Sequence, residues 1–242
     1  HVAVPTTSRK SFSGSTAHTN PMTDFTREAA IDRAEAIVDA VETEPMPVPV
    51  REVWVYGDVA LGMDPIERLD VYVTKDILFG RDGDAAERFR ESHGVEGVGE
   101  TVSAEWAEQY PEHIRTNPSG HVAPEKCLAA HLLEDDEPIH LEVCNASFED
   151  NVTQRLRGAQ TRDNGEQLLD PRGVCLWLSD GEESQRSDDA FEKLRNGELV
   201  FPTLSESLTM LGLDEGQASE AAEAVEAFRQ RQDGRSVRGD VV

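Results

Sequence analysis

The chain has 242 residues, 38% of them apolar, and carries 48 Asp and Glu against 23 Lys and Arg, which gives a formal charge of −25. This length allows one large domain or two small ones around a sizeable core. The charge disfavours a nucleic-acid partner, because such binding is driven largely by Lys and Arg, although net charge alone does not exclude RNA. No apolar run approaches the roughly 18 to 20 residues that cross a bilayer, so we expect a cytoplasmic protein without a membrane partner.

The cations are almost all arginine. Only four of the 23 are lysine, at positions 10, 75, 126 and 193. Acidic surfaces poor in lysine suit molar KCl, where the Debye length falls to about 3 Å and repulsion between carboxylates is screened. The acids are spread along the chain among apolar positions, unlike those of an acidic disordered tail. The composition therefore predicts a protein of a salt-in halophile.

The chain begins with a segment of different composition. Residues 1–21 contain no Asp or Glu, and the following 221 residues carry all 48 acids. We interpret residues 1–21 as a disordered or non-native tail: either translation starts at Met22 after upstream read-through or an added tail, or the segment is a genuine flexible N-terminus. We expect an α/β domain over 22–180, a helical C-terminal region over 181–231 and a flexible tail over 232–242.

Hydrophobic spacing and capping signals predict a mixture of helices and strands in chain order. A helix over 26–43, capped by Thr26, ends before Pro45. Strands are predicted at 50–56, 69–74, 138–144 and 172–178. Helices are predicted at 84–92, 102–110, 122–133, 147–160, 187–195, 203–212 and 214–231. The expected fold is α/β (α+β), with a small mixed sheet of about four strands and a helical C-terminal extension.

The first two strands carry a distinctive turn between them. Strand 50–56 is followed by Gly57 and Asp58, and the second strand begins Arg68-Leu69-Asp70. This arrangement resembles the core of the nucleotidyltransferase superfamily, in which one strand ends in Gly-Ser and the next carries two carboxylates one residue apart. The resemblance extends to Glu142, which lies between apolar residues as the family's third acid does. It covers about a third of the chain and implies a similar fold.

The resemblance also implies roles for individual residues. In the family, carboxylates hold Mg²⁺ and a glycine-rich turn approaches the triphosphate. Carried over, Asp70 and Glu142 would be the catalytic and metal-binding acids, assisted by Arg68. The residues expected at the phosphates of the nucleotide are Gly57, Asp58, Gly62 and Arg155.

The sequence departs from the family pattern at two positions. Arg68 stands where the first acid of the pair belongs, and Asp58 stands where the family has Ser; both changes weaken metal and phosphate binding. Two hypotheses follow. The first is an active Mg-dependent nucleotidyltransferase that uses Asp70 and Glu142. The second, which we favour, is a degenerate, non-catalytic protein that binds a nucleotide, or binds a protein partner through its helical C-terminal region.

Alternation predicts where the two acids point. Leu69 and Val71 flank Asp70, as Leu141 and Val143 flank Glu142. Because successive side chains of a strand point to opposite faces, apolar neighbours in the core send both acids to the other face. The two carboxylates should therefore share one face of the sheet.

Three cysteines, Cys127, Cys144 and Cys175, are too few and too scattered for a disulfide framework and fit a reducing cytosol. Cys127-x3-His131 and His140-x3-Cys144 resemble a symmetric zinc site. However, His140 and Cys144 would lie about 13 Å apart on an extended strand. Zinc ligands lie about 2.0 to 2.3 Å from the ion, so this spacing argues against a zinc site.

A local cationic patch follows strand 138–144, formed by Arg155, Arg157 and Arg162. It could bind phosphate or RNA, but pairing with nearby acids of the same chain is the simpler use. Those acids are Glu149, Asp150 and Asp163. Over its whole length from Met22, and notably in 124–133 and 148–159, the chain resembles an uncharacterised conserved haloarchaeal protein family, which brings no assigned activity.

Overall fold

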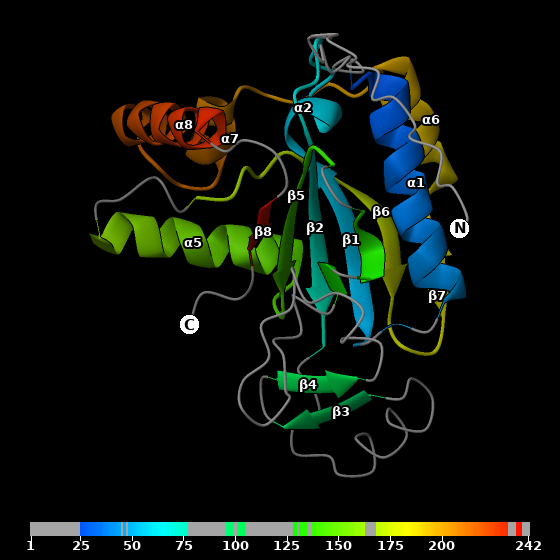
Figure 1. Ribbon diagram of the computed structural model, residues 1–242. Helices are drawn as coiled ribbons and strands as arrows, with labels where there is room; N and C mark the ends of the chain where they lie inside the picture. Colours follow the sequence, from blue (N-terminus) through cyan, green and yellow to red (C-terminus); the bar gives the residue numbers. More distant parts are fainter. Residues whose placement is uncertain are drawn as a thin grey trace, which may run out of the picture.

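The structure is a computed structural model that describes residues 25–44, 46, 48–76, 95–98, 101–104, 128–129, 131–134, 137–162, 168–231 and 236–238. Its centre is a six-stranded mixed sheet in the order β7–β6–β1–β2–β5–β8 (Figure 1). The strands are β1 (Val50–Tyr56), β2 (Leu69–Lys75), β5 (Ile139–Cys144), β6 (Gly173–Ser179), β7 (Ser184–Arg186) and β8 (Ser236–Arg238). The helices are α1 (Arg27–Thr43), α2 (Gly57–Ala60), α5 (Phe148–Arg162), α6 (Asp188–Asn196), α7 (Leu204–Met210) and α8 (Glu215–Gln230). The predicted mixed α/β fold with C-terminal helices is confirmed.

Strand pairing explains the two faces of the sheet. β1 runs antiparallel to both β2 and β6, whereas β2 and β5 are parallel, with Asp70 opposite His140 and Tyr72 opposite Glu142. From Glu52 onward in β1, and in β2 and β5, the apolar odd-numbered residues are buried in the main apolar core: Val53, Val55, Leu69, Val71, Val73, Ile139, Leu141 and Val143. Even-numbered residues therefore point to the other face, as the predicted alternation requires.

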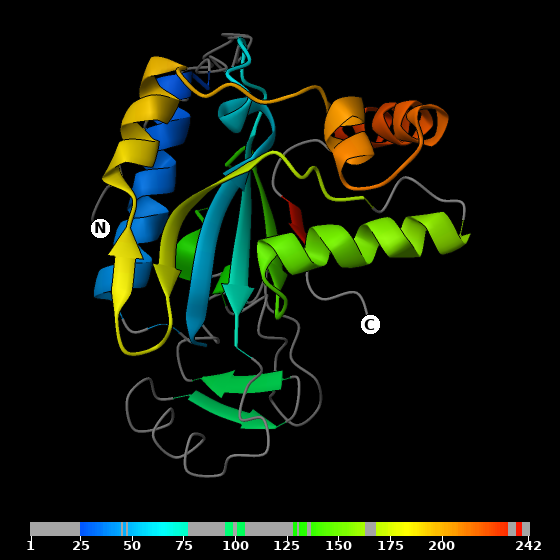
Figure 2. The ribbon, with the colours of Figure 1, turned by 180° about the vertical axis from the view of Figure 1, so that it is seen from behind.

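Helices cover both faces. Helices α1 and α6 lie side by side over the apolar face (Figures 1 and 2). They bury Ile31, Ile37, Phe191 and Leu194 against the odd-numbered strand residues. Helix α1 begins where expected, because the side chain of Thr26 accepts a hydrogen bond from the backbone N–H of Ala29. Helix α5 covers the opposite face.

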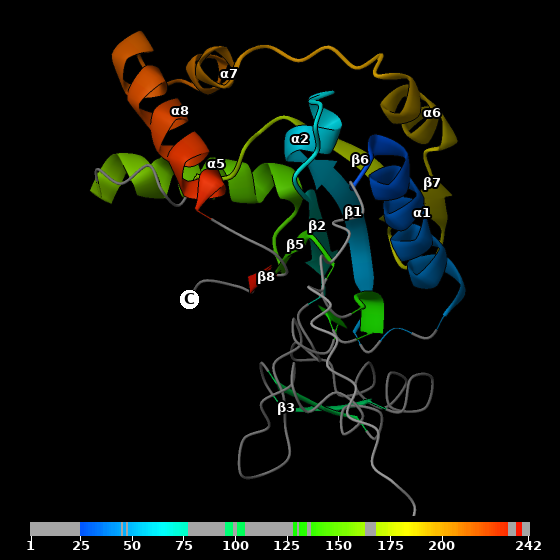
Figure 3. The same ribbon diagram turned by 45° about the horizontal axis from the view of Figure 1, so that its top comes forward.

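Helices α7 and α8 form a hairpin beside α5 (Figure 3). Their apolar side chains make a separate cluster with α5, which contains Leu156, Leu204, Leu208, Leu213 and Val225. A capping box of Thr203 and Glu206 starts α7, and Asp214 caps α8. Leu208 and Val225 therefore bury their surface within the hairpin and against α5, apart from the main core.

Several predicted elements differ in detail. Residues 102–104, expected at the start of the predicted helix 102–110, lie instead in β4 (Thr101–Ala104), which pairs with β3 (Val95–Val98) in a separate two-stranded sheet. The sheet has six strands instead of about four, because β7 and β8 have only three residues each and carry no alternation signal. Strand β8 lies in the tail expected to be flexible. Helix α6, expected in the C-terminal region 181–231, packs with α1 on the main core.

Other expectations concern residues beyond the described ranges. The tail 1–21 and the predicted helix 84–92 lie entirely outside the residues that the structure describes. Within the predicted helix 122–133, the described residues 128–129 and 131–132 are helical. None of the helices in the described ranges is long and apolar enough to cross a membrane.

Candidate functional site

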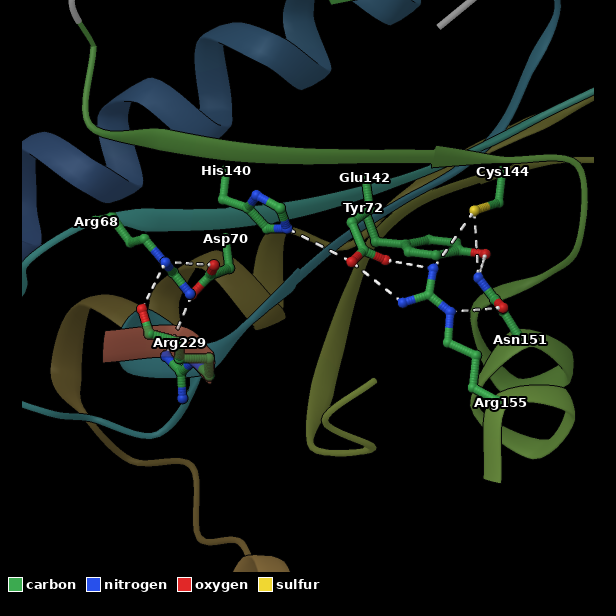
Figure 4. Close-up of polar contacts among 9 residues, drawn as sticks. All are labelled: Arg68, Asp70, Tyr72, His140, Glu142, Cys144, Asn151, Arg155 and Arg229. Carbon is green, nitrogen blue, oxygen red and sulfur yellow. Dashed lines mark hydrogen bonds and ion pairs between the residues drawn. The ribbon is translucent and has the colours of Figure 1, made fainter. Parts of the chain in front are cut away.

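The face of the sheet opposite α1 carries a buried layer of polar side chains (Figure 4). Asp70 on β2 and Glu142 on β5 both lie in it, with 0% and 3% of their surface exposed. The strands β2 and β5 are adjacent and parallel. Asp70 lies opposite His140, so Glu142 is two residues further along β5 and points to the same face of the sheet as Asp70. The face predicted for both acids is therefore the one they occupy. A buried carboxylate needs a counter-charge and hydrogen bonds, and the two acids obtain them from different partners.

The first set of partners, here called the Asp70 group, contains Asp58, Arg68, Asp70 and Arg229. Nε of Arg68 donates to Oδ1 of Asp70 at 2.8 Å, and Nη2 of Arg229 lies 3.2 Å from Oδ2. The same Nη2 lies 2.7 Å from Oδ1 of Asp58. In return, Nη1 of Arg68 donates to the backbone carbonyl of Arg229 at 3.1 Å. Sheet and helix α8 thus hold each other through two arginines.

Gly57 permits this close approach. It has a φ of 68°, in the left-handed region that favours glycine. A Cβ at this position would lie 2.2 Å from Oδ2 of Asp70 and 2.6 Å from Nη2 of Arg229. The space beside the turn that was expected to receive nucleotide phosphates is therefore filled by a carboxylate and a guanidinium of the chain itself.

The second set of partners, here called the Glu142 group, is centred on Glu142, Arg155 and His140. Nη2 of Arg155 lies 2.8 Å from Oε2 of Glu142, and Nη1 donates to Oε1 at 3.2 Å. This two-pronged contact matches the geometry in which arginine binds a carboxylate most strongly. Nε2 of His140 lies 3.5 Å from Oε1 of Glu142. Arg155, on α5, therefore supplies the counter-charge that the buried Glu142 needs.

Asn151 completes the Glu142 group. Its Oδ1 accepts from Nε of Arg155 at 3.1 Å, and its Nδ2 donates to the hydroxyl of Tyr72 at 2.9 Å and to Sγ of Cys144 at 3.3 Å. The Tyr72 hydroxyl donates to the carbonyl of Ala146 at 2.9 Å. These contacts fix the rotamers of both Asn151 and Arg155, so the group is a connected network spanning β2, β5 and α5.

The two acids respond differently to their surroundings. Burial raises the pKa of Asp70, and the charges of Arg229 and Arg68 only partly offset it. Burial also acts to raise the pKa of Glu142, but the hydrogen bond from His140 and the charge of Arg155 outweigh it and lower the pKa to about 2. Glu142 is therefore held as a carboxylate at neutral pH.

The remaining candidates have these positions. Asp58 pairs with Arg229, and Arg68, the supposed catalytic assistant, pairs with Asp70. Gly62 also has a positive φ, of 71°, but a Cβ at this position would meet only Nη2 of Arg27, at 4.0 Å, which belongs to neither group. Arg155 pairs with Glu142, an acid that the sequence pattern did not assign to it; of the acids that it did suggest, Asp163 lies outside the described residues.

A metal ion would have to displace these arginines. Among the described residues, no three His, Cys, Asp or Glu side chains are grouped so that they could hold one ion. Of the four residues weighed for zinc, Cys127 lies outside the described ranges and His131 lies 3.0 Å from Glu44. His140 and Cys144 lie at opposite ends of β5, in contact with Glu142 and Asn151 respectively.

Comparison with known proteins supplies a family. A family model described as "Family of unknown function (DUF7095)" matches residues 26–242. The chain belongs to this family. The match to DUF7095 includes the sheet, α5 and the α7–α8 hairpin, and therefore both polar groups. No curated protein and no solved structure matches the chain. The prediction of an uncharacterised family is confirmed, and DUF7095 brings no activity, so function rests on the site itself.

Sequence reasoning missed the residues that complete the two groups. Arg229 is 159 positions from Asp70, and nothing in the periodicity of α8 distinguishes it from a surface cation in a last helical turn. Asn151 lies four residues before Arg155, so spacing places both on one face of α5. The polarity of Asn151 on the buried side of the helix, on the same face as Arg155, is the signal that could have identified it.

Proposed function

We propose that this protein is a non-catalytic interaction module of a halophile cytosol, built on a core that resembles a nucleotidyltransferase. The observation that carries the proposal is the internal pairing of both candidate metal ligands. Asp70 is bound by Arg68 and Arg229, and Glu142 is bound by Arg155. Removing one partner from a buried ion pair typically costs about 3–5 kcal/mol, so Mg²⁺ would have to repay that loss before it bound.

The surroundings of Gly57 support the same proposal. Nucleotide phosphates need backbone N–H groups that they can reach, and here Asp70 and Arg229 fill the space beside the turn. Asp58 adds a further negative charge next to it. A bound triphosphate would therefore meet two carboxylates without the metal that normally offsets them.

Exposed apolar side chains at and just before the C-terminal helices support the proposal of a protein partner. Five large apolar side chains are exposed among the described residues, and three of them lie between positions 200 and 211. These are Val200 at 93%, Met210 at 79% and Leu211 at 42% exposed. Exposed apolar side chains gathered in one segment are typical of protein contact sites, and Met suits adaptable surfaces. The segment we propose for partner contact runs from Val200, just before α7, into the α7–α8 hairpin.

A titration with nucleotide tests the non-catalytic assignment. Mg²⁺ or Mn²⁺ with ATP is titrated in molar KCl against the native chain and an Asp70→Asn, Glu142→Gln double variant, with calorimetry as the readout. The proposal predicts no saturable heat for either protein. Saturable binding to the native chain that the double variant loses would instead support a metal-dependent nucleotidyltransferase.

A further inference from the structure

The turn between α7 and α8 exposes two neighbouring apolar side chains. Met210 ends α7 and Leu211 follows it, with 79% and 42% of their surface exposed. Apart from its chain neighbours, a Cβ at Gly212 would meet nothing within 4 Å among the described residues, so the space on that side of the turn is open. Helix α8 begins at this turn, away from the sheet, and ends beside the sheet (Figure 3). The turn is therefore an apolar surface at the edge of the molecule.

The same part of the chain is acidic and has no cation of its own. From position 196 to position 228 the sequence contains no Lys or Arg but seven acids, all of them exposed. They are Glu198, Glu206, Asp214, Glu215, Glu220, Glu223 and Glu226. Among the described residues, none of these seven forms an ion pair. The exposed Asp32 and Asp39 of α1 differ, because Arg195 and Arg186 pair with them. Negative charge is thus left uncompensated beside the apolar turn and along α8.

Three of the seven acids form a row along α8. Glu220, Glu223 and Glu226 are three residues apart, and residues at this spacing are neighbours on a helix surface. All three are exposed, whereas Ala222 and Val225 between them are buried, so the row lies on the solvent side of the helix. At 1.5 Å per residue, the row ends about 17 Å from the start of α8. A partner helix of about 15 residues, about 22 Å long, is long enough to span the row and the apolar turn.

The charge of this surface narrows the choice of partner. Uncompensated carboxylates repel phosphate, so neither a nucleic acid nor an anionic membrane matches it. A second copy of the chain in a symmetric dimer would place the same acids against one another. A cationic protein surface is complementary, and arginine suits it better than lysine, because a guanidinium binds a carboxylate through two parallel N–H···O bonds. In molar KCl charges further apart than about 3 Å are screened, so pairs in direct contact are the ones that contribute.

We propose that the α7–α8 hairpin binds an arginine-bearing amphipathic helix of a partner protein. Apolar side chains of that helix cover Met210 and Leu211, and its guanidinium groups pair with the row of acids on α8. The apolar contact supplies affinity that salt does not screen, and the arginines select the partner by charge. This inference names the partner of the proposed contact segment and therefore rests on the proposed function.

The experiment measures the binding of three fluorescent peptides to the full chain by anisotropy in molar KCl. Each peptide has about 15 residues with leucine at helical spacing, and its polar positions are all arginine, all glutamine or all glutamate. Two double variants remove the two contacts: Met210→Ser with Leu211→Ser, and Glu220→Gln with Glu223→Gln. The matched controls are Leu178→Ser, which removes an apolar side chain 47% exposed on β6, and Glu182→Gln with Glu183→Gln in the exposed turn before β7. All the substituted side chains are at least partly exposed, and a circular-dichroism melt checks that each variant folds.

The arginine peptide should bind the native chain at least tenfold more tightly than the glutamine peptide, and the glutamate peptide should bind least. Loss of Met210 and Leu211 should weaken binding of the arginine peptide about tenfold, because the centre of the apolar contact is removed. Loss of Glu220 and Glu223 should weaken it about fivefold, since exposed ion pairs are individually weak. Both controls should stay within about twofold of the native chain.

Three results would overturn the inference: no binding of the arginine peptide, equal binding of the arginine and glutamine peptides, or losses in the control variants as large as those in the hairpin variants. Equal binding of the two peptides that still depends on Met210 and Leu211 rejects the arginine-bearing partner and leaves the contact segment in place. Failure of the proposed function has a different readout, since saturable binding of Mg²⁺ with ATP contradicts it and none of the peptide titrations contains nucleotide or metal.

Discussion

Individual residues of the polar face are constrained by what lies within a few ångströms of them. Gly57 and Gly62 both have a positive φ, of 68° and 71°, but only Gly57 has close neighbours. Asp70 and Glu142 are both buried, but only Glu142 has its pKa lowered. Each contrast gives a matched pair of variants that separates the effect of the neighbours from the effect of the backbone or of burial.

Replacing the two glycines by alanine should have unequal effects. In Gly62→Ala the only cost is that a residue with a Cβ must adopt the left-handed backbone conformation, which destabilises by about 1–2 kcal/mol. Gly57→Ala adds a clash with Asp70 and Arg229, and crowding of this kind costs about 1–3 kcal/mol more. Chemical denaturation in molar KCl measures both. Equal losses would mean that the contact between Gly57 and Asp70 is not close.

The pH dependence of stability should change in opposite directions in two variants. The lowered pKa of Glu142 means that the folded state releases this proton more readily, so its contribution to stability is present above pH 4.5 and is lost as the pH falls toward about 2. The raised pKa of Asp70 means that the folded state retains the proton, so its contribution falls as the pH rises above 3.8. As the pH increases from 2 to 4.5, the free energy of unfolding should rise less in the Glu142→Gln variant than in the native chain. Above pH 3.8, it should rise more steeply in the Asp70→Asn variant than in the native chain.

Denaturant unfolding at several pH values checks this expectation. Asp150→Asn, at an exposed position in the first turn of α5, is a control that changes one acid without touching either group. Identical slopes for Glu142→Gln and the native chain would contradict the lowered pKa.

At the scale of elements, one carboxylate ties β1 to α5. Oε2 of Glu52 accepts hydrogen bonds from Nε1 of Trp54 at 3.0 Å, from Oγ1 of Thr74 at 2.9 Å and from the backbone N–H of Phe148 at 3.1 Å. Phe148 is the first residue of α5, so a negative charge stands at the positive end of that helix. Phe148 also stacks on Trp54, with ring centroids 4.7 Å apart.

Replacing this carboxylate should loosen the start of α5. Glu52→Gln keeps the size of the side chain but removes the charge, and should lower the free energy of unfolding by about 1–2 kcal/mol, since hydrogen bonds to a charged group are the stronger ones. The matched control is Glu149→Gln, an exposed acid in the first turn of the same helix, for which we expect a few tenths of a kcal/mol. Equal losses in the Glu52 and Glu149 variants would mean that the Glu52 carboxylate stabilises α5 only through the helix dipole and not through its hydrogen bonds.

The features that could be predicted from the sequence are those set by interactions between residues close together in the chain. The strands β1, β2, β5 and β6 and the helices α1, α5, α6, α7 and α8 lie near their predicted positions, because apolar spacing and caps are local. The shared face of Asp70 and Glu142 was likewise predictable, since alternation fixes it. Three-residue strands carry too little pattern, and the partner of Asp70 on α8 depends on long-range packing that no local signal records.

Over the whole molecule, surface charge should govern stability. The formal charge is −25, and some of the arginines that pair are shared among several acids. Arg186 pairs with Glu35, Asp39, Glu42 and Asp188, which joins β7 to α1 and α6. Added salt weakens such exposed pairs, so any stabilisation by salt must come from screening of the excess negative charge.

The melting temperature should therefore rise with KCl. Between about 0.1 M and 1 M salt, the Debye length falls from about 10 Å to about 3 Å, and repulsion among the uncompensated acids falls with it. Thermal melts over this range, with NaCl as a parallel series, measure the effect. A melting temperature independent of KCl would contradict the prediction of a halophile protein.

The central claim is that arginines of the chain neutralise the acids of the polar face, and a double-mutant cycle on Arg155 and Glu142 tests it most directly. Unfolding free energies are measured for Arg155→Gln, Glu142→Gln and the double variant, with Arg157→Gln on the exposed side of α5 as control. We expect Arg155→Gln to cost about 3–5 kcal/mol, because it leaves Glu142 buried without its arginine, and the Arg157 variant to stay within about 0.5 kcal/mol. The double variant should lose less than the sum, with a coupling of about 1–3 kcal/mol. Additive losses would show that Arg155 does not neutralise Glu142 and would contradict the account.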